Sequence, residues 1–176
     1  MINYRFHNSL EKSIRYAEIF VGYLEELKIN FTTGIPCGVQ KHLIKNLILS
    51  RRISHIISNS EQESIGIAAG AYLAGKKPLV YMQNSGFFAS SNDIASLLIP
   101  YKIPILFTVT WRGLPTEDAP QHKVTGNSTI ELISSLGLGW GVLSKSNSKE
   151  MLKRAMLTME GTSLPFIILI KRGWDE

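Results

Sequence analysis

The chain has 176 residues, a formal net charge of +5 and 44% hydrophobic residues, which is typical of one soluble globular domain with a full core. Its basic residues are scattered, without the stripe of cations and interleaved aromatics that indicates nucleic-acid binding. The single cysteine, Cys37, excludes an internal disulfide, fits a reducing cytoplasm and, with four scattered histidines, predicts no metal site. We expect no secretory signal in residues 1–12 and no membrane span.

Apolar spacing along the chain predicts an alternation of helices and strands. In chain order we expect helix 9–28, strand 30–33, helix 39–48, strand 53–58, helix 60–74, strand 79–82, helix 91–99, strand 105–110, a polar loop over about 111–126, helix 127–136, strand 139–143, helix 147–160 and strand 165–170. The strands are short and continuously apolar, as in parallel sheets that are covered on both faces. The predicted fold is a single α/β domain over residues 1–176, a three-layer doubly wound sheet of about six parallel strands with helices on both faces.

The most informative stretch is residues 60–75, where the apolar run that ends at Ser58 leads into an acid and then a helix of small residues. This places Glu61 at a strand-to-helix corner, where open parallel sheets bind their ligands. Two interpretations are open for this acid. Ser60 and Glu63 have the spacing of a capping box, and Glu61 in the first turn also complements the helix dipole. Alternatively, Glu61 protonates a ring nitrogen of a cofactor.

Three other strand ends carry unusual residues. Residues 33–38 form a tight Gly-Pro corner, which is either a plain turn or a place where backbone touches a ligand. Residues 83–88 offer amides, a glycine and two exposed-looking phenylalanines, suited to a planar ligand, a partner subunit or a helix cap. Residues 111–122 offer a guanidinium, two carboxylates, an amide and an imidazole, and His122 is either a proton shuttle or a surface histidine.

Together these four segments resemble the pyrimidine-binding domain of thiamine-diphosphate-dependent decarboxylases, in particular phosphonopyruvate decarboxylase and the alpha subunit of sulfopyruvate decarboxylase. The similarity runs from about residue 12 to 172, and its most specific part is 61–86. The residues that carry it are Gly34-Ile35-Pro36-Cys37, Glu61 with Ala68 to Pro78, Val80-Tyr81-Met82-Gln83-Asn84-Ser85-Gly86, Trp111-Arg112-Gly113 and Pro120-Gln121-His122.

The resemblance implies specific roles for these residues. Glu61 corresponds to the glutamate that hydrogen-bonds N1′ of the aminopyrimidine, and His122 to a proton donor or orienting group at the reacting carbon; these two are the expected catalytic residues. The expected cofactor contacts are Pro36, Glu61, Ser85, Gly86 and Phe87. The expected substrate contacts are Cys37, Gly38, Arg112, Gln121 and His122, with no metal ligand in this chain.

The resemblance also implies a partner. The family's diphosphate-binding domain, which holds thiamine diphosphate through Mg²⁺, is marked by Gly-Asp-Gly, and this sequence has no such motif. We therefore expect the diphosphate site on a separate beta subunit, in a cytoplasmic hetero-oligomer of α2β2 form or larger. The expected activity is decarboxylation of phosphonopyruvate, sulfopyruvate or a similar anionic pyruvate analogue. The alternatives are a two-subunit carboligase that uses the same cofactor and a non-catalytic structural subunit.

Three positions depart from the family pattern. Gly38 stands where relatives often have serine, Phe87-Phe88 replaces Leu-Gly, and Ala119 replaces a glutamate. All three lie where the resemblance places a substrate tail or the cofactor's edge. Two bulky rings there would make the pocket narrower or more apolar, so the substrate of this chain can differ from phosphonopyruvate.

Overall fold

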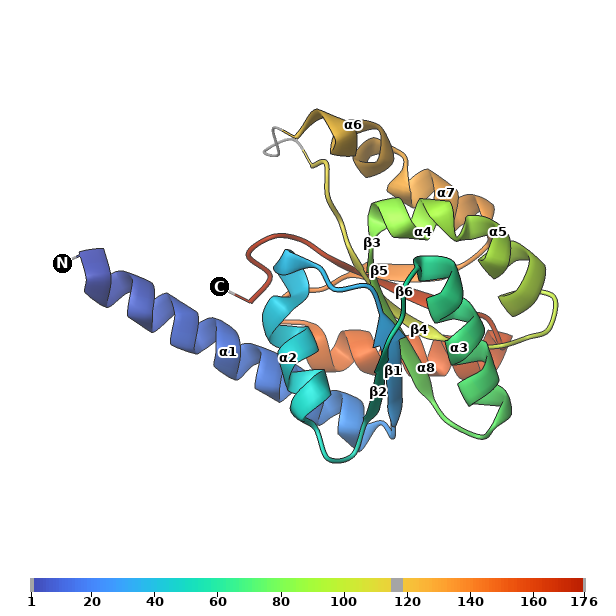
Figure 1. The fold of residues 1–176 in the computed structure, drawn as a ribbon, viewed down its shortest axis with the longest axis horizontal. Coiled ribbons are helices and arrows are strands. Elements are labelled where there is room, and N and C mark those ends of the chain that lie inside the picture. The colour runs from blue at the N-terminus through green and yellow to red at the C-terminus, as the bar shows by residue number, and fades with distance from the viewer. Residues whose placement is uncertain (1, 115–118, 176) are drawn as a thin grey trace.

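Six parallel strands form the centre of the structure, a computed structural model that describes residues 2–114 and 119–175 (Figure 1). The strand order across the sheet is β2-β1-β3-β4-β6-β5, and each neighbouring pair is parallel. This confirms the predicted α/β class and the number of strands. The strands are β1 (Phe31–Gly34), β2 (Ser54–Ile57), β3 (Pro78–Gln83), β4 (Leu106–Thr110), β5 (Gly139–Val142) and β6 (Phe166–Ile170).

Helices cover both faces of the sheet and bury two separate hydrophobic clusters. One face packs against α1 (Ile2–Glu26), α2 (Lys41–Leu49) and α8 (Ser148–Thr162). The other packs against α3 (Glu61–Leu73), α4 (Asn84–Ala89), the π-helical turn η2 (Ile94–Leu98) that continues α5 (Ser91–Asp93), and α7 (Thr129–Ser135). The amino-terminal part of α1 extends away from the body (Figure 1). None of the helices in the described ranges is long and apolar enough to cross a membrane.

The structure differs from the sequence prediction at two helices and one strand. Residues 83–88, expected as a loop, begin α4 directly after β3, and the expected loop 111–126 contains α6 (Pro120–Asn127). The strand β2 is not covered on both faces, because it is the edge strand, and Ile56 and Ile57 are exposed. The strands β3, β4 and β6 are buried along almost their whole length, as their apolar sequence predicts.

A close approach at Gly34 joins three strands near the carboxyl edge of the sheet. A Cβ atom on Gly34 would lie 2.0 Å from the carbonyl oxygen of Tyr81, which accepts a hydrogen bond from the Ile35 N–H at 3.2 Å. The ring of Tyr81 also lies over Gly34, and its hydroxyl is hydrogen-bonded to Nε2 of His55 on β2 at 2.8 Å. The absent side chain therefore lets Tyr81 reach across β1 and fix the edge strand that leads to Glu61.

Replacing Gly34 with alanine should destabilise the chain by about 1–3 kcal/mol, because the new methyl group meets backbone that cannot rotate away. Urea unfolding measures the change. Gly66→Ala is the matched control: Gly66 lies on α3 with open space around its Cβ position, so the change should stabilise the helix by about 0.5–1 kcal/mol. Equal stability of Gly34→Ala and the wild type would show that the close approach is not a constraint.

The His55–Tyr81 pair should make stability depend on pH. Burial lowers the pKa of His55 below its usual value of about 6.5. The unfolded chain then binds the proton first as the pH falls, so the stabilisation is complete above about pH 6.5 and is lost as the pH falls through the lowered folded pKa. Between pH 7 and 5 the wild type should lose more unfolding free energy than His55→Gln. His42→Gln, which removes a histidine outside this pair, is the control, and parallel losses in wild type and His55→Gln would contradict the prediction.

Candidate functional site

The carboxyl ends of β1 to β4 meet at one edge of the sheet, and the segments that follow them form the candidate site. Gly34 at the end of β1 pairs with Ile57 on one side and Tyr81 on the other, and Gln83 at the end of β3 pairs with Thr110 on β4. Because the strands end at similar levels, the helices α3 and α4 both begin at this edge. This is the place where open parallel sheets bind ligands.

Glu61 lies at the first turn of α3 and faces Gly86 on α4. A Cβ atom on Gly86 would lie 2.3 Å from Oε1 of Glu61, so only glycine leaves room for this carboxylate. Capping of the helix is done by other groups: the Ser60 hydroxyl accepts the Glu63 N–H at 3.1 Å, and Glu63 Oε2 accepts the Asn59 N–H at 2.5 Å. In the described part of the chain Glu61 has no hydrogen-bond partner, and its side chain is half-buried, so the carboxylate is free to meet a ligand.

The residues beside Gly86 differ in their accessibility. Ser85 is exposed, and its hydroxyl accepts a hydrogen bond from Gln83 Nε2 at 2.7 Å. Phe87, which the sequence suggested was exposed, is fully buried and packs edge-to-face on Phe107, with ring centroids 6.3 Å apart. The Phe87 side chain therefore belongs to the core and does not narrow a pocket. Only the backbone of Phe87 is left to contact a ligand, whereas Phe88 is half-buried.

Asn84 fixes the segment after β4 onto the end of β3. Its buried side chain donates from Nδ2 to the Arg112 carbonyl and to Thr129 Oγ1, each at 3.0 Å, and its Oδ1 accepts the Arg112 N–H at 3.3 Å. The backbone of Arg112 is thus held at the candidate site, and its side chain is half-buried. Sequence reasoning did not indicate this anchoring role for Asn84.

The helix α6 holds His122 against the same segment. Gly113 has φ +84°, and a Cβ atom there would lie 1.9 Å from the His122 carbonyl oxygen. Trp111 Nε1 donates to the Gly126 carbonyl at 2.9 Å, which fastens the far end of α6. The Nδ1 atom of His122 is buried and has no hydrogen-bond partner among the described residues. Gln121 beside it is exposed, and the two carboxylates expected in this loop, Glu117 and Asp118, lie outside the described residues.

The segment after β1 borders an open groove. Pro36 and Gly38 are exposed and Cys37 is half-buried. The groove has a volume of about 470 Å³ and runs along α2, with two cations and several apolar side chains in its lining. It is lined by Pro36, Cys37, Gly38, Lys41, Ile44, Lys45, Ile48 and Leu49.

Below this edge, the buried side chain of Gln40 is hydrogen-bonded to both β3 and β4. Its Nε2 donates to the carbonyls of Met82 and Thr108 and to Thr110 Oγ1, at 2.9 to 3.2 Å. Gln40 belongs to the turn η1 (Gly38–Gln40) and so ties the segment after β1 to the ends of β3 and β4. Sequence reasoning missed it, because a lone glutamine before an apolar helix carries no signal of burial.

The structure thus brings together Glu61 and Gly86 in direct contact, and it places α6, which carries His122, against α4. Pro36, Cys37 and Gly38 follow the neighbouring strand at the same edge. The described residues contain no group of three or more His, Cys, Asp or Glu side chains that could hold a metal ion. The arrangement offers a carboxylate for a basic or N–H-bearing ring atom, an imidazole, and cations beside an open groove.

The similarity of this chain to known proteins covers the segments that form the candidate site. Residues 14–131 match a family model described as thiamine pyrophosphate enzyme, N-terminal TPP binding domain. A phosphonopyruvate decarboxylase of Streptomyces viridochromogenes is 29% identical over 160 residues, which cover 89% of this chain and 40% of that protein. A sulfopyruvate decarboxylase subunit alpha of Methanocaldococcus jannaschii is 42% identical over 110 residues, 62% of this chain and 65% of that subunit.

A further sulfopyruvate decarboxylase subunit alpha, of Methanothermobacter thermautotrophicus, is 34% identical over 113 residues, 64% of this chain and 68% of that subunit. The matched segment therefore spans less than half of the Streptomyces protein and about two thirds of the two archaeal subunits. The match with the family model includes the segments that carry Pro36, Glu61, Gly86 and His122.

Asn84→Ala should lower the free energy of unfolding by about 2 kcal/mol, because it removes the hydrogen bonds from a buried side chain to the Arg112 backbone and to the Thr129 hydroxyl. Urea unfolding measures the loss. Ser85→Ala, one residue along on the exposed side of α4, is the control and should stay within about 0.5 kcal/mol of wild type. If both variants unfold at the same urea concentration as wild type, Asn84 is not the anchor.

Proposed function

This chain belongs to the thiamine pyrophosphate enzymes, whose N-terminal TPP binding domain it matches, and on that premise we propose that it is the alpha subunit of a two-subunit 2-keto acid decarboxylase. The proposed substrate is phosphonopyruvate, sulfopyruvate or a similar anionic pyruvate analogue. The observation that carries the proposal is the Glu61 carboxylate, which lies against Gly86 at the start of α3 and has no partner in the described part of the chain.

The residues at this edge fit thiamine diphosphate. Glu61 and His122 Nδ1 are polar groups without a partner among the described residues, and Gly86 leaves room for the acid at this edge of the sheet. When bound, the cofactor supplies the electron sink into which a 2-keto acid loses carbon dioxide. Glu61 holds a proton at the ring nitrogen of the aminopyrimidine, while the backbone at Pro36, Gly86 and Phe87 and the hydroxyl of Ser85 orient that ring.

The other residues act on the substrate. His122 donates a proton or orients the reacting group, since proton transfer is the usual task of an imidazole near neutral pH. Arg112 is suited to a bidentate contact with a phosphonate or sulfonate. Cys37, Gly38 and Gln121 complete the proposed substrate contacts. Lys41 and Lys45 in the adjoining groove add positive charge that favours an anionic substrate.

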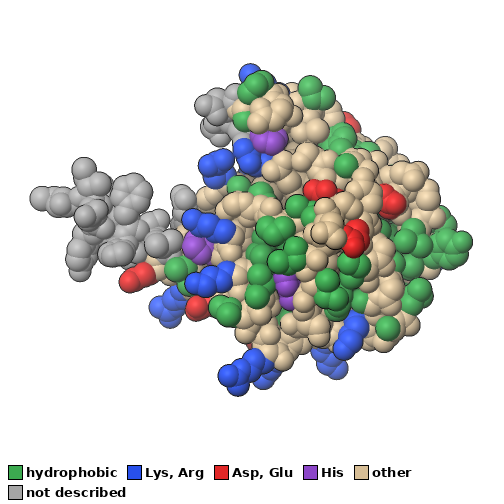
Figure 2. Space-filling view, in the orientation of Figure 1, with side chains coloured by type: hydrophobic (Ala, Val, Ile, Leu, Met, Phe, Trp, Pro, Cys, Tyr) green, Lys and Arg blue, Asp and Glu red, His purple; other side chains and the backbone are tan. Residues whose placement is uncertain are grey.

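We also propose that a beta subunit binds the diphosphate through Mg²⁺, within a cytoplasmic hetero-oligomer of α2β2 form or larger. Two relatives are named as alpha subunits, which supports a subunit partner. Figure 2 shows hydrophobic side chains gathered over α2, β2 and α3. This surface is suited to burial against another subunit. Large apolar side chains exposed on these elements are Ile48, Leu49, Ile56, Ile57 and Leu73. A contiguous exposed apolar surface of this kind marks a protein–protein contact.

In the assembled enzyme, Glu61→Gln and Glu61→Ala should each reduce the rate of 2-keto acid decarboxylation by roughly 10²–10⁴-fold, the usual effect of losing a positioned proton-transfer group. Release of carbon dioxide from phosphonopyruvate and from sulfopyruvate measures the rate. Gly86→Ala should lower the rate as well, because its methyl group displaces the Glu61 carboxylate.

Glu63→Gln is the matched control, since it removes an acid from the same turn of α3 that takes part only in the cap. It should keep nearly full activity. Unchanged activity of Glu61→Gln would reject the catalytic role. Full decarboxylase activity from the purified chain alone, with thiamine diphosphate and Mg²⁺, would reject the need for a beta subunit.

A further inference from the structure

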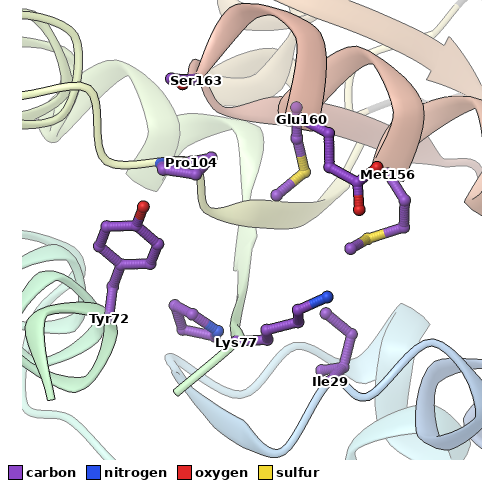
Figure 3. A pocket seen from close by; sticks show the side chains of 9 residues that line it. Ile29, Tyr72, Lys77, Pro104, Met156, Glu160 and Ser163 are labelled. Atoms are coloured by element: carbon purple, nitrogen blue, oxygen red, sulfur yellow. The ribbon is translucent and has the colours of Figure 1, made fainter. Parts of the chain in front are cut away.

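A second cavity lies at the opposite edge of the sheet from Glu61. It has a volume of about 290 Å³ and lies between the end of α3, the starts of β3 and β4, and α8 (Figure 3). Since α3 has 13 residues and is therefore roughly 20 Å long, this cavity is separate from the candidate active site. Its size is at the lower end of small-molecule sites, which measure about 300–1,000 Å³.

The walls of this cavity are apolar and well packed. Ile29, Met156 and Met159 are almost completely buried, and two prolines complete the lining. Pro78 and Pro104 have no N–H group, so these two positions offer no backbone donor to a ligand. The lining side chains are therefore the main donors to polar groups of a ligand, while the thioethers of the methionines can adapt to an aliphatic group.

Two opposite charges face the cavity from different elements. Figure 3 shows Glu160 reaching into the space from α8 and Lys77 extending beneath it from the start of β3. Within the described ranges these two side chains form no ion pair, with each other or with any other residue. Tyr72 lies on the far wall, and its hydroxyl also has no hydrogen-bond partner among the described residues. The cavity thus combines an apolar interior with an exposed cation and an exposed anion at its rim, neither of them paired within the described ranges.

From this arrangement we propose that the cavity binds a small aliphatic α-amino acid as its zwitterion. The ammonium group of the ligand pairs with Glu160, its carboxylate pairs with Lys77, and its side chain packs against the two methionines and Pro104. The charges explain the choice: a purely anionic ligand meets Glu160 and a purely cationic one meets Lys77, whereas a ligand with both charges pairs with both groups. The proposal is independent of the function proposed for the opposite edge.

The methionine methyl groups of the full chain provide a direct test by NMR. On titration with L-leucine, the ¹³C-labelled methyl signals of Met156 and Met159 should shift saturably, and that of Met82, buried in the other hydrophobic cluster, should not. Each charge contributes a charge-assisted hydrogen bond, so 4-methylpentanoate and isopentylamine, which lack one charge each, should bind about tenfold or more weakly than leucine.

Lys77→Met and Glu160→Gln should each weaken leucine binding about tenfold or more. The controls are Lys76→Met and Glu150→Gln, which remove exposed charges beside β3 and on α8 but outside the lining, and these should bind leucine as the wild type does. The proposal is overturned if leucine moves neither methyl signal up to its solubility limit, if either single-charge analogue binds as tightly as leucine, or if Lys77→Met and Glu160→Gln leave the affinity unchanged.

Discussion

The contact between a carboxylate and a glycine decides the geometry of the candidate site. Oε1 of Glu61 lies where a side chain on Gly86 would be. The starts of α3 and α4 are therefore separated by this one carboxylate. The parallel register makes this possible, since β2 and β3 flank β1, β2 ends level with it and β3 ends two residues farther on. Gly34 and Gly113 act in the same way at neighbouring segments, where missing side chains admit the Tyr81 and His122 carbonyl groups. The edge is therefore assembled by close backbone approach, and the functional side chains project from it.

The first turn of α3 divides two tasks between two glutamates. Ser60 and Glu63 satisfy the N–H groups of Glu63 and Asn59, a cap that stabilises a helix by about 1 kcal/mol. Glu61 takes no part in this cap, although the positive end of the helix dipole favours its charge. The cap is therefore made by Ser60 and Glu63, and Glu61 remains available for the proposed contact with the cofactor. An acid at this position can contact a ligand without weakening the cap of the helix.

The sequence was sufficient for the sheet but not for the segments that complete the site. The strands β3, β4 and β6 are largely apolar runs, and all six alternate with helices, so their existence and their order along the chain could be predicted. The helix α4 was missed because six residues around Gly86 are too short for a helical period, and Asn84 fixes it by contacts far along the chain. The helix α6 begins at Pro120, and proline is favoured at the first position of helices, but the polar residues around it predicted a loop. The prediction that Phe87 is exposed was wrong, because its burial depends on the helix α4. The burial of Gln40 could not be predicted either, because no local sequence pattern indicates it.

The proposed chemistry requires more shielding than this chain gives. A carboxyl group that exchanges a proton with a ring nitrogen works best where water is excluded, because its interactions strengthen as the local dielectric falls. Glu61 is only half-buried, and the groove beside Pro36 and Cys37 is open. Apolar side chains on α2 and β2, the elements nearest that groove, are exposed as well. The same covering surface would bury these side chains and remove water from the acid, so stability of the assembly and activity of the site would depend on one interface. That coupling is a physical argument for the proposed beta subunit.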